Sequence, residues 1–189
     1  MRSVDAVTRG TFLVASPLLR DPNFLRTVVL MCDHTDEGSW GLVVNRRTDL
    51  TFGTLLEDLP FPAATNGPVF WGGPVETSRM QTLHRLRRDL GEVTEVCPGV
   101  DLGLDVDTFR EVLDGTLMPG ESLQAYVGHA GWGPGQLEAE LATGSWIPCT
   151  AEARFVFEVD PEEMWERVLR SLGRNFARLA TVPLDPRVN

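Results

Sequence analysis

Three histidines, His34, His84 and His129, are the residues of this chain best suited to acid–base chemistry near neutral pH. Cys32 precedes His34 by two positions in an apolar run, so on a strand the two side chains would project to the same face. With a further histidine or cysteine they could ligate zinc. No pair has the close spacing that is typical of zinc fingers or metalloproteases. The sequence therefore predicts packed or strand-end histidines and no metal site.

Candidate nucleophiles are few, and their sequence contexts are unfavourable. Ser39 and Ser145 each lie in Gly-Ser-Trp, which lacks the Gly-x-Ser-x-Gly pattern of a nucleophile elbow. Cys32 is interpreted as a small buried hydrophobe, since a thiolate needs a cationic neighbour such as protonated His34. All 17 basic residues are arginine, and the missing lysine excludes Schiff-base, pyridoxal-phosphate and P-loop chemistry. No catalytic set and no cofactor is predicted.

The densest motif lies at residues 126–140, where an apolar run ends in four glycines within eight residues. We expect a tight turn over 128–135, leading into a helix with Gly133 as N-cap and Pro134 as its first residue. Free amides at a helix N-terminus can bind an anion. However, Pro134 lacks an amide, and acidic side chains such as Glu138 already stand in the first turns. The alternative is a turn that shapes the fold, in which Trp132 packs on the core.

The elements that must position these residues are mostly strands. Strands are predicted over 11–15, 27–33, 40–45, 69–71, 80–86, 92–97, 122–127 and 154–159. Helical spacing is found over 52–59, after Asp107, after Gly133 and from Pro161, where Asp160 and Glu163 resemble a capping box. Few strands are separated by a crossover helix, so the pattern indicates an α+β fold with an antiparallel or mixed sheet. A single domain over 1–189 is predicted, with residues 161–182 as a C-terminal helical segment.

The charge balance is acidic, with a formal net charge of −10 from 27 acidic and 17 basic residues. Nucleic-acid binding depends on a basic face that displaces counterions from phosphates, so this balance disfavours direct nucleic-acid binding. One basic group lies near the C-terminus and comprises Arg167, Arg170, Arg174 and Arg178. We interpret it as a solvated helix face that is paired with the glutamates at 162, 163 and 166.

Cysteine usage and hydropathy predict the compartment. Cys32, Cys97 and Cys149 are odd in number and far apart, which favours a reducing cytoplasm over a disulfide framework. The apolar runs are of strand length and too short to span a bilayer. Residues 1–10 are charged and lack the apolar core of a signal peptide. We therefore expect a cytoplasmic protein with no membrane association.

Several motifs occur together in a characteristic order. They are Gly10-Thr-Phe-Leu-Val-Ala15, Asp21-Pro-Asn-Phe24, Gly41-Leu-Val-Val-Asn45, Gly72-Gly73-Pro74, Arg79, Leu83-His84, Ala130-Gly-Trp-Gly133 and Gly135-Gln-Leu-Glu138. In this combination, over about residues 9–172, the chain resembles the YqgE/AlgH family of small bacterial proteins. The resemblance implies a strongly curved, partly barrel-like sheet flanked by helices. It implies no biochemical activity, because none is established for the family, although "transcriptional regulator" is often attached to its members.

Three functional hypotheses follow, and the residues do not choose among them. The first is a non-catalytic binding or regulatory protein for a small ligand or a protein partner. The second is an enzyme of unknown class, which requires at least two histidines within about 10 Å across one pocket. The third is DNA binding through the C-terminal arginines, which the acidic balance opposes. The candidate binding or cleft residues are His34, Asn45, Gly72, Gly73, Pro74, His84, His129, Gly131, Trp132, Gly135 and Gln136.

Overall fold

The fold is seen in a computed structural model that describes residues 1, 3, 6–55, 67–85, 93–103 and 123–182. Its strands are β1 (Thr11–Ala15), β2 (Val28–Thr35), β3 (Gly38–Val43), β4 (Arg47–Thr51), β5 (Pro68–Trp71), β6 (Val75–His84), β7 (Thr94–Cys97), β8 (Val100–Leu102), β9 (Leu123–Trp132) and β10 (Trp146–Thr150). Its helices are α1 (Phe52–Leu55), α3 (Gln136–Ala142), α4 (Ala153–Phe157), α5 (Pro161–Ser171) and α6 (Arg174–Leu179).

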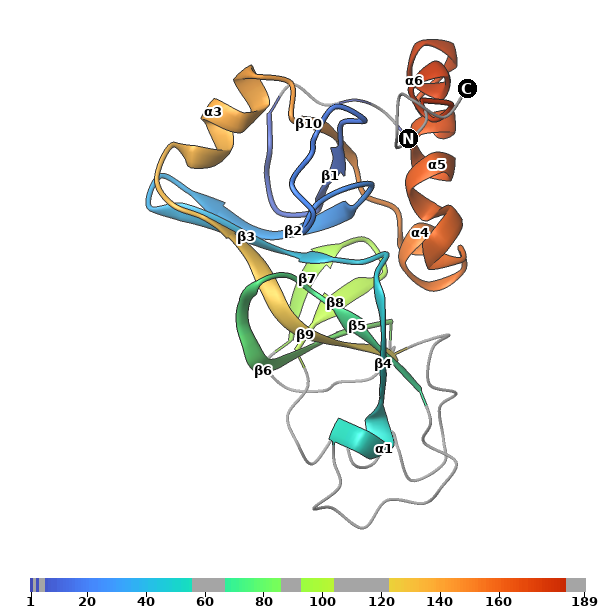
Figure 1. Cartoon of the computed structure of the whole chain (residues 1–189). Coiled ribbons are helices and arrows are strands. Elements are labelled where there is room, and N and C mark those ends of the chain that lie inside the picture. Colours follow the sequence, from blue (N-terminus) through green and yellow to red (C-terminus); the bar gives the residue numbers. More distant parts are fainter. Residues whose placement is uncertain (2, 4–5, 56–66, 86–92, 104–122, 183–189) are drawn as a thin grey trace.

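The strands form one strongly curled, mostly antiparallel sheet in the order β10-β1-β2-β3-β9-β6-β8-β7 (Figure 1). Off this path, β4 pairs with β5, and β5 pairs in parallel with β9. Helices α3, α4, α5 and α6 surround the part of the sheet made by β1, β2, β3 and β10 (Figure 1). The predicted α+β class with a curved, mixed sheet and flanking helices is therefore confirmed.

Strand β1 shows why the N-terminal strands are continuous apolar runs. Its five residues are all buried, yet neighbouring side chains enter different cores, because they alternate across the sheet. Phe12 and Val14 join the cluster that contains Trp165 of α5, whereas Leu13 and Ala15 join the cluster that contains Leu137 of α3. Both faces of this part of the sheet are thus covered by helices, a situation that selects unbroken apolar strands.

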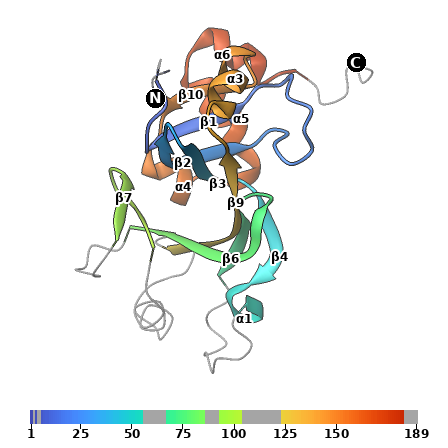
Figure 2. The same ribbon diagram turned by 90° about the vertical axis from the view of Figure 1, so that its left-hand side faces the viewer.

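Strand β9 joins the two parts of the sheet. Its first residues lie between β5 and β6, and its last residues pair with β3. Figure 2 shows it running from the part formed by β4 and β6 into the part formed by β1, β2 and β3. The predicted strand at 122–127 therefore continues to Trp132, and the predicted turn over 128–135 is wrong for its first half. The helix also begins later than predicted, with Gly135 as N-cap and Gln136 as its first residue.

Two further predictions are wrong near the C-terminus. Residues 154–159 were expected to form a strand, but Ala153–Phe157 is helix α4. The run Phe155-Val156-Phe157 is fully buried, and so short an apolar run does not distinguish a buried helix from a buried strand. Strand β10 was not predicted because it contains Pro148. It is an edge strand that pairs only with β1 among the described strands, and edge strands tolerate proline.

Helix α5 confirms the capping prediction. The Asp160 side chain accepts a hydrogen bond from the Glu162 amide at 2.9 Å, and Pro161 occupies the first turn. Met164, Trp165 and two later apolar residues face the core. Of the helix expected over 52–59, the structure describes only Phe52–Leu55, and the helix expected after Asp107 lies outside the described residues.

Candidate functional site

The Gly72-Gly73 link crosses strand β9 at Gly128 and His129. A Cβ on Gly72 would lie 2.3 Å from the Gly128 carbonyl oxygen, and one on Gly73 would lie 2.1 Å from the His129 carbonyl carbon. Gly128 has the same constraint, since its Cβ would lie 2.3 Å from the Gly73 oxygen. Only glycine permits two backbones to approach so closely. The two glycine motifs therefore mark one backbone crossing, and this crossing fixes His129 beside the start of β6.

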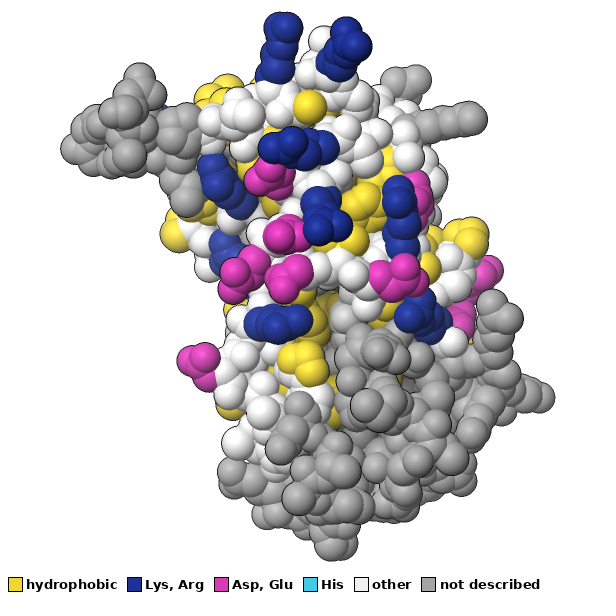
Figure 3. Space-filling model, turned by 90° about the vertical axis from the view of Figure 1, so that its right-hand side faces the viewer, with side chains coloured by type: hydrophobic (Ala, Val, Ile, Leu, Met, Phe, Trp, Pro, Cys, Tyr) yellow, Lys and Arg dark blue, Asp and Glu magenta, His cyan; other side chains and the backbone are white. Residues whose placement is uncertain are grey.

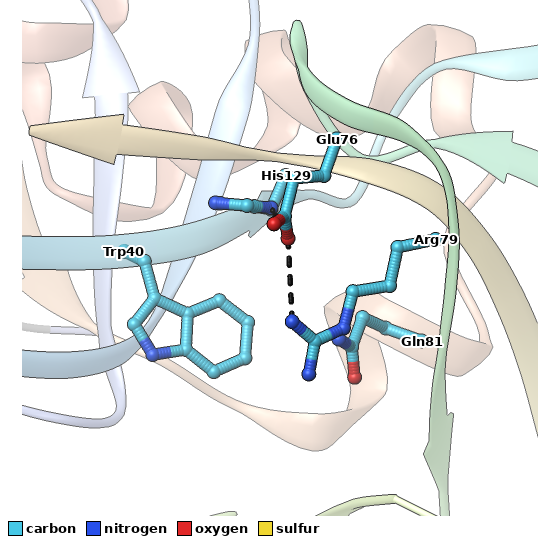
Figure 4. A pocket seen from close by; sticks show the side chains of 5 residues that line it. All are labelled: Trp40, Glu76, Arg79, Gln81 and His129. Carbon is cyan, nitrogen blue, oxygen red and sulfur yellow. Dashed lines mark hydrogen bonds and ion pairs between the residues drawn. The ribbon is translucent and has the colours of Figure 1, made fainter.

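A pocket of about 250 Å³ opens next to this crossing. Five described side chains line it and come from three adjacent strands: Trp40 from β3, Glu76, Arg79 and Gln81 from β6, and His129 from β9. The pairing of the strands explains their convergence, because Trp40 pairs with Gly131 and Gln81 pairs with Tyr126 on the shared strand β9. Figure 4 shows the indole, the guanidinium and the imidazole surrounding a common space.

Glu76 lies between the two basic side chains of the pocket. Its Oε2 is 3.3 Å from Arg79 Nη1 and 3.9 Å from His129 Nδ1 (Figure 4). The Glu76 backbone has a φ of 48°, in the left-handed region that non-glycine residues rarely adopt. This conformation belongs to an irregular stretch of β6, where the pairing with β9 shifts between Val75 and Met80. The bulge directs consecutive β6 side chains into the pocket in a way that simple alternation would not.

His129 has an environment that favours the neutral imidazole. Burial lowers its pKa from the ordinary value, Glu76 acts in the opposite direction, and Arg79 lowers the pKa further. Its ring meets the Trp40 ring edge to face, with centroids 5.8 Å apart. At pH 7 this side chain can therefore donate one hydrogen bond and accept another.

The other two histidines lie elsewhere. His34 contacts Ser39 Oγ through Nδ1 at 2.6 Å, and its Nε2 is 3.5 Å from Glu138 Oε1. Ser39 and Trp40 are neighbours on β3 and project to opposite faces, so His34 lies on the sheet face opposite the pocket. His84 is fully buried, with Nε2 2.8 Å from the Gly103 carbonyl oxygen. Among the described residues that line the pocket, His129 is the one histidine.

Most remaining candidates make contacts that stabilise the fold. The Asn45 side chain accepts from the Val28 amide and donates to the Arg26 carbonyl oxygen, which ties together the ends of β2 and β3. Gln136 accepts from the Gly133 amide and donates to Glu140 at 3.0 Å. Gly131 and Gly135 belong to β9 and to the N-cap of α3, and Pro74 is exposed beside the glycine crossing.

Glu140 organises the segment that follows β9. Its Oε2 accepts hydrogen bonds from Trp132 Nε1 at 3.0 Å and from Trp146 Nε1 at 2.7 Å. Both indoles pack against Phe24, and Trp132 is almost fully buried. These contacts favour the interpretation of the glycine-rich segment as a fold-shaping turn, with Trp132 on the core as expected.

Four pocket residues were missed by the sequence reasoning: Trp40, Glu76, Arg79 and Gln81. Arg79 is part of the family motif set, but no chemistry was assigned to it. Residues 79 and 81 are two apart and share a strand face, and this signal was available in the sequence. It was missed because the polar stretch 75–79 was not recognised as the beginning of β6.

The cysteines are free and buried, as predicted for Cys32. Burial raises the pKa of Cys32 to about 12, that of Cys149 to about 12 and that of Cys97 to about 11, so none is a thiolate near pH 7. Within the described part of the chain, no three His, Cys, Asp or Glu side chains are grouped so that they could hold a metal ion.

The C-terminal arginines are interleaved with acidic side chains. Arg167 pairs with Glu163 at 2.6 Å, and Arg170 pairs with Glu166. Figure 3 shows alternating basic and acidic side chains on the face that carries α4, α5 and α6. The predicted solvated, paired helix face is confirmed for these two arginines. Separately, none of the helices described has both the length and the apolar character needed to cross a membrane.

Comparisons with known proteins agree with this architecture. The family model for AlgH-like proteins matches residues 12–177. A UPF0301 protein of Azoarcus sp. (strain BH72) is 36% identical over 177 residues, covering 90% of this chain and 92% of that protein. A UPF0301 protein of Streptomyces coelicolor is 38% identical over 205 residues, covering 100% and 98%.

Solved structures match over nearly the whole chain. The solution structure of AlgH from Pseudomonas aeruginosa has a TM-score of 0.77 and 32% identity, covering 97% of this chain and 98% of that one. A Corynebacterium diphtheriae protein has a TM-score of 0.73 at 22% identity, covering 96% and 95%, and shows the same fold.

Proposed function

This chain belongs to the AlgH-like family, and we propose that it is a non-catalytic regulatory protein that binds a small ligand in the pocket beside His129. The observation that carries the proposal is the convergence of Trp40, Arg79, Gln81 and His129 on one hollow of about 250 Å³. A flat ring beside a few hydrogen-bonding groups is the usual composition of a small-molecule site. The described walls contain no serine, cysteine or threonine that could act as a nucleophile.

The proposal includes a compartment and a negative statement about nucleic acid. Three free, buried cysteines suit a reducing cytoplasm. The net charge of −10 and the ion-paired arginines of α5 oppose direct contact with DNA or RNA. Regulation would then act through the ligand or through a protein partner that senses the ligand-bound state.

The proposal is tested by NMR on ¹⁵N-labelled protein, titrated with a panel of neutral, cationic and anionic fragments. Trp40 is the one tryptophan among the described pocket residues, so its indole N–H signal reports occupancy. The Trp132 and Trp146 indoles are hydrogen-bonded to Glu140 and serve as controls in the same spectrum. We expect at least one fragment class to shift Trp40 and His129 and to leave the controls unchanged. If no class does so at millimolar concentration, the proposed site is wrong.

A second candidate function, an enzyme, is favoured by one observation. Ser39 Oγ, His34 and the Glu138 carboxylate are in line, at 2.6 and 3.5 Å, an arrangement that can activate a serine. In this mechanism Ser39 would attack an acyl or phosphonyl centre and His34 would take its proton. A fluorophosphonate probe tests it, since attack would release fluoride and leave the phosphonyl group on Ser39. Labelling that is lost in Ser39→Ala and in His34→Ala supports an enzyme, and an unmodified mass excludes this site.

A further inference from the structure

The Glu76 carboxylate occupies a position to which two potential donors already point. Arg79 Nη1 and His129 Nδ1 approach the same oxygen, Oε2, from two different strands. Each contact is longer than a strong charge-assisted hydrogen bond, which is usually about 2.7–2.9 Å. The position is therefore suited to a carboxylate oxygen, but the internal carboxylate satisfies it only loosely.

Glu76 is held weakly enough to be displaced. Its side chain is 52% exposed and that of Arg79 is 65% exposed, and ion pairs in such settings are close to neutral in their effect on stability. Leaving the pocket would return the carboxylate to water without breaking any shorter contact that the structure shows for it. An external carboxylate of the same charge can thus compete for Arg79 and His129.

The rest of the pocket indicates the size and shape of the competitor. A volume of about 250 Å³ equals that of about eight water molecules in the liquid, so a ligand of roughly ten heavy atoms fills it. The Trp40 ring forms one wall, and rings stack well on indole. The Gln81 amide, beside the guanidinium in Figure 4, adds a donor and an acceptor.

We propose that the pocket binds a small flat carboxylate, whose charged end displaces Glu76 from Arg79 and His129 while its ring lies along Trp40. Glu76 thereby acts as an internal competitor that keeps the site closed to weak ligands. This inference rests on the proposed ligand-binding function and adds to it the chemical class of the ligand. Inorganic phosphate shares the charge but lacks the ring, so it separates anion binding from recognition of a flat carboxylate.

The experiment titrates benzoate, benzamide and inorganic phosphate into the full chain and follows the Trp40 indole and His129 imidazole signals. Benzamide has the shape of benzoate without its charge. The variants are Glu76→Gln, Arg79→Gln and, as matched control, Glu163→Gln. The control changes the net charge equally and removes an exposed ion pair with Arg167, but it lies on α5, outside the pocket.

We expect benzoate to bind more tightly than benzamide and phosphate. Glu76→Gln should bind benzoate roughly three- to tenfold more tightly than the wild type, because it removes an exposed competitor of like charge. Arg79→Gln should bind it at least about tenfold more weakly, and Glu163→Gln should match the wild type. Equal affinity for benzoate and benzamide, or no gain in Glu76→Gln over Glu163→Gln, overturns the inference and leaves the proposed ligand-binding function standing. If phosphate binds as tightly as benzoate, recognition of the ring is wrong. If none of the probes and no neutral or cationic fragment shifts Trp40, the proposed function fails as well.

Discussion

Replacing Gly73 with alanine tests the backbone crossing that underlies the site. The added Cβ would lie 2.1 Å from the His129 carbonyl carbon, and the φ of Gly73 is +149°, where side chains are strained. Ordinary contact begins near 3.4 Å, so the two backbones must separate by about 1 Å. Overpacking of this kind costs about 1–3 kcal/mol, and the backbone conformation adds about 1–2 kcal/mol. We expect a loss of about 3–5 kcal/mol, which lowers Tm by roughly 10 °C or more for a chain of this length.

Three other glycines separate the two contributions. Gly72→Ala meets a backbone oxygen at 2.3 Å without a positive φ, so it isolates the clash. Gly144→Ala has open space but a φ of +72°, so it isolates the backbone strain. Gly133→Ala has neither and should be within about 0.5 kcal/mol of the wild type. Urea unfolding followed by circular dichroism gives the free energies. If Gly72→Ala were as stable as Gly133→Ala, the close crossing would be refuted.

Two further predictions concern single side chains. Glu140→Ala leaves two buried indole N–H groups without their acceptor and should lower the free energy of unfolding by about 2–4 kcal/mol, whereas Glu138→Ala on the same helix should change it by less than about 1 kcal/mol; equal effects in urea unfolding would contradict this role. His129 should titrate below the ordinary histidine pKa in an NMR pH series, lower still in Glu76→Gln and higher in Arg79→Gln, because these neighbours act in opposite directions. The sign for stability follows, since an unfolded chain binds this proton first: the contribution of His129 is complete above about pH 6.5 and is lost as the pH falls through the lower folded pKa. An unchanged His129 pKa in both variants would show that the contacts in the pocket are absent in solution.

The fold class was predictable because its strongest elements carry signals that do not depend on distant partners. The cap formed by Asp160 and Pro161 fixes the start of α5, and β1 is apolar at every position because both of its faces are covered. Strand β10 lacks such a signal, since Pro148 reads as a strand breaker until the strand is known to lie at an edge. The helix α4 was misassigned for a related reason, because burial on all sides removes the period that distinguishes helix from strand.

The pocket was predictable only in part, through His129. Trp40 and Arg79 are far apart in the sequence and meet because β3 and β6 both pair with β9 at registers that no local pattern specifies. Glu76 is harder still to predict, since its direction depends on a bulge and a positive φ within β6. Periodicity predicts which face a residue occupies, but it does not predict which strand lies beside it.

The glycines that identify the family also build the pocket, although none of them is among its described lining residues. The absence of Cβ atoms at Gly73 and Gly128 lets the chain cross β9 in contact with its backbone, and β6 then begins with Val75 paired to His129. That register places Glu76 and Arg79 beside the imidazole. A larger residue at the crossing would shift β6 relative to β9 and would separate the donors that meet at the Glu76 carboxylate. A dense glycine motif can therefore be required for a binding site while contributing only backbone geometry to it.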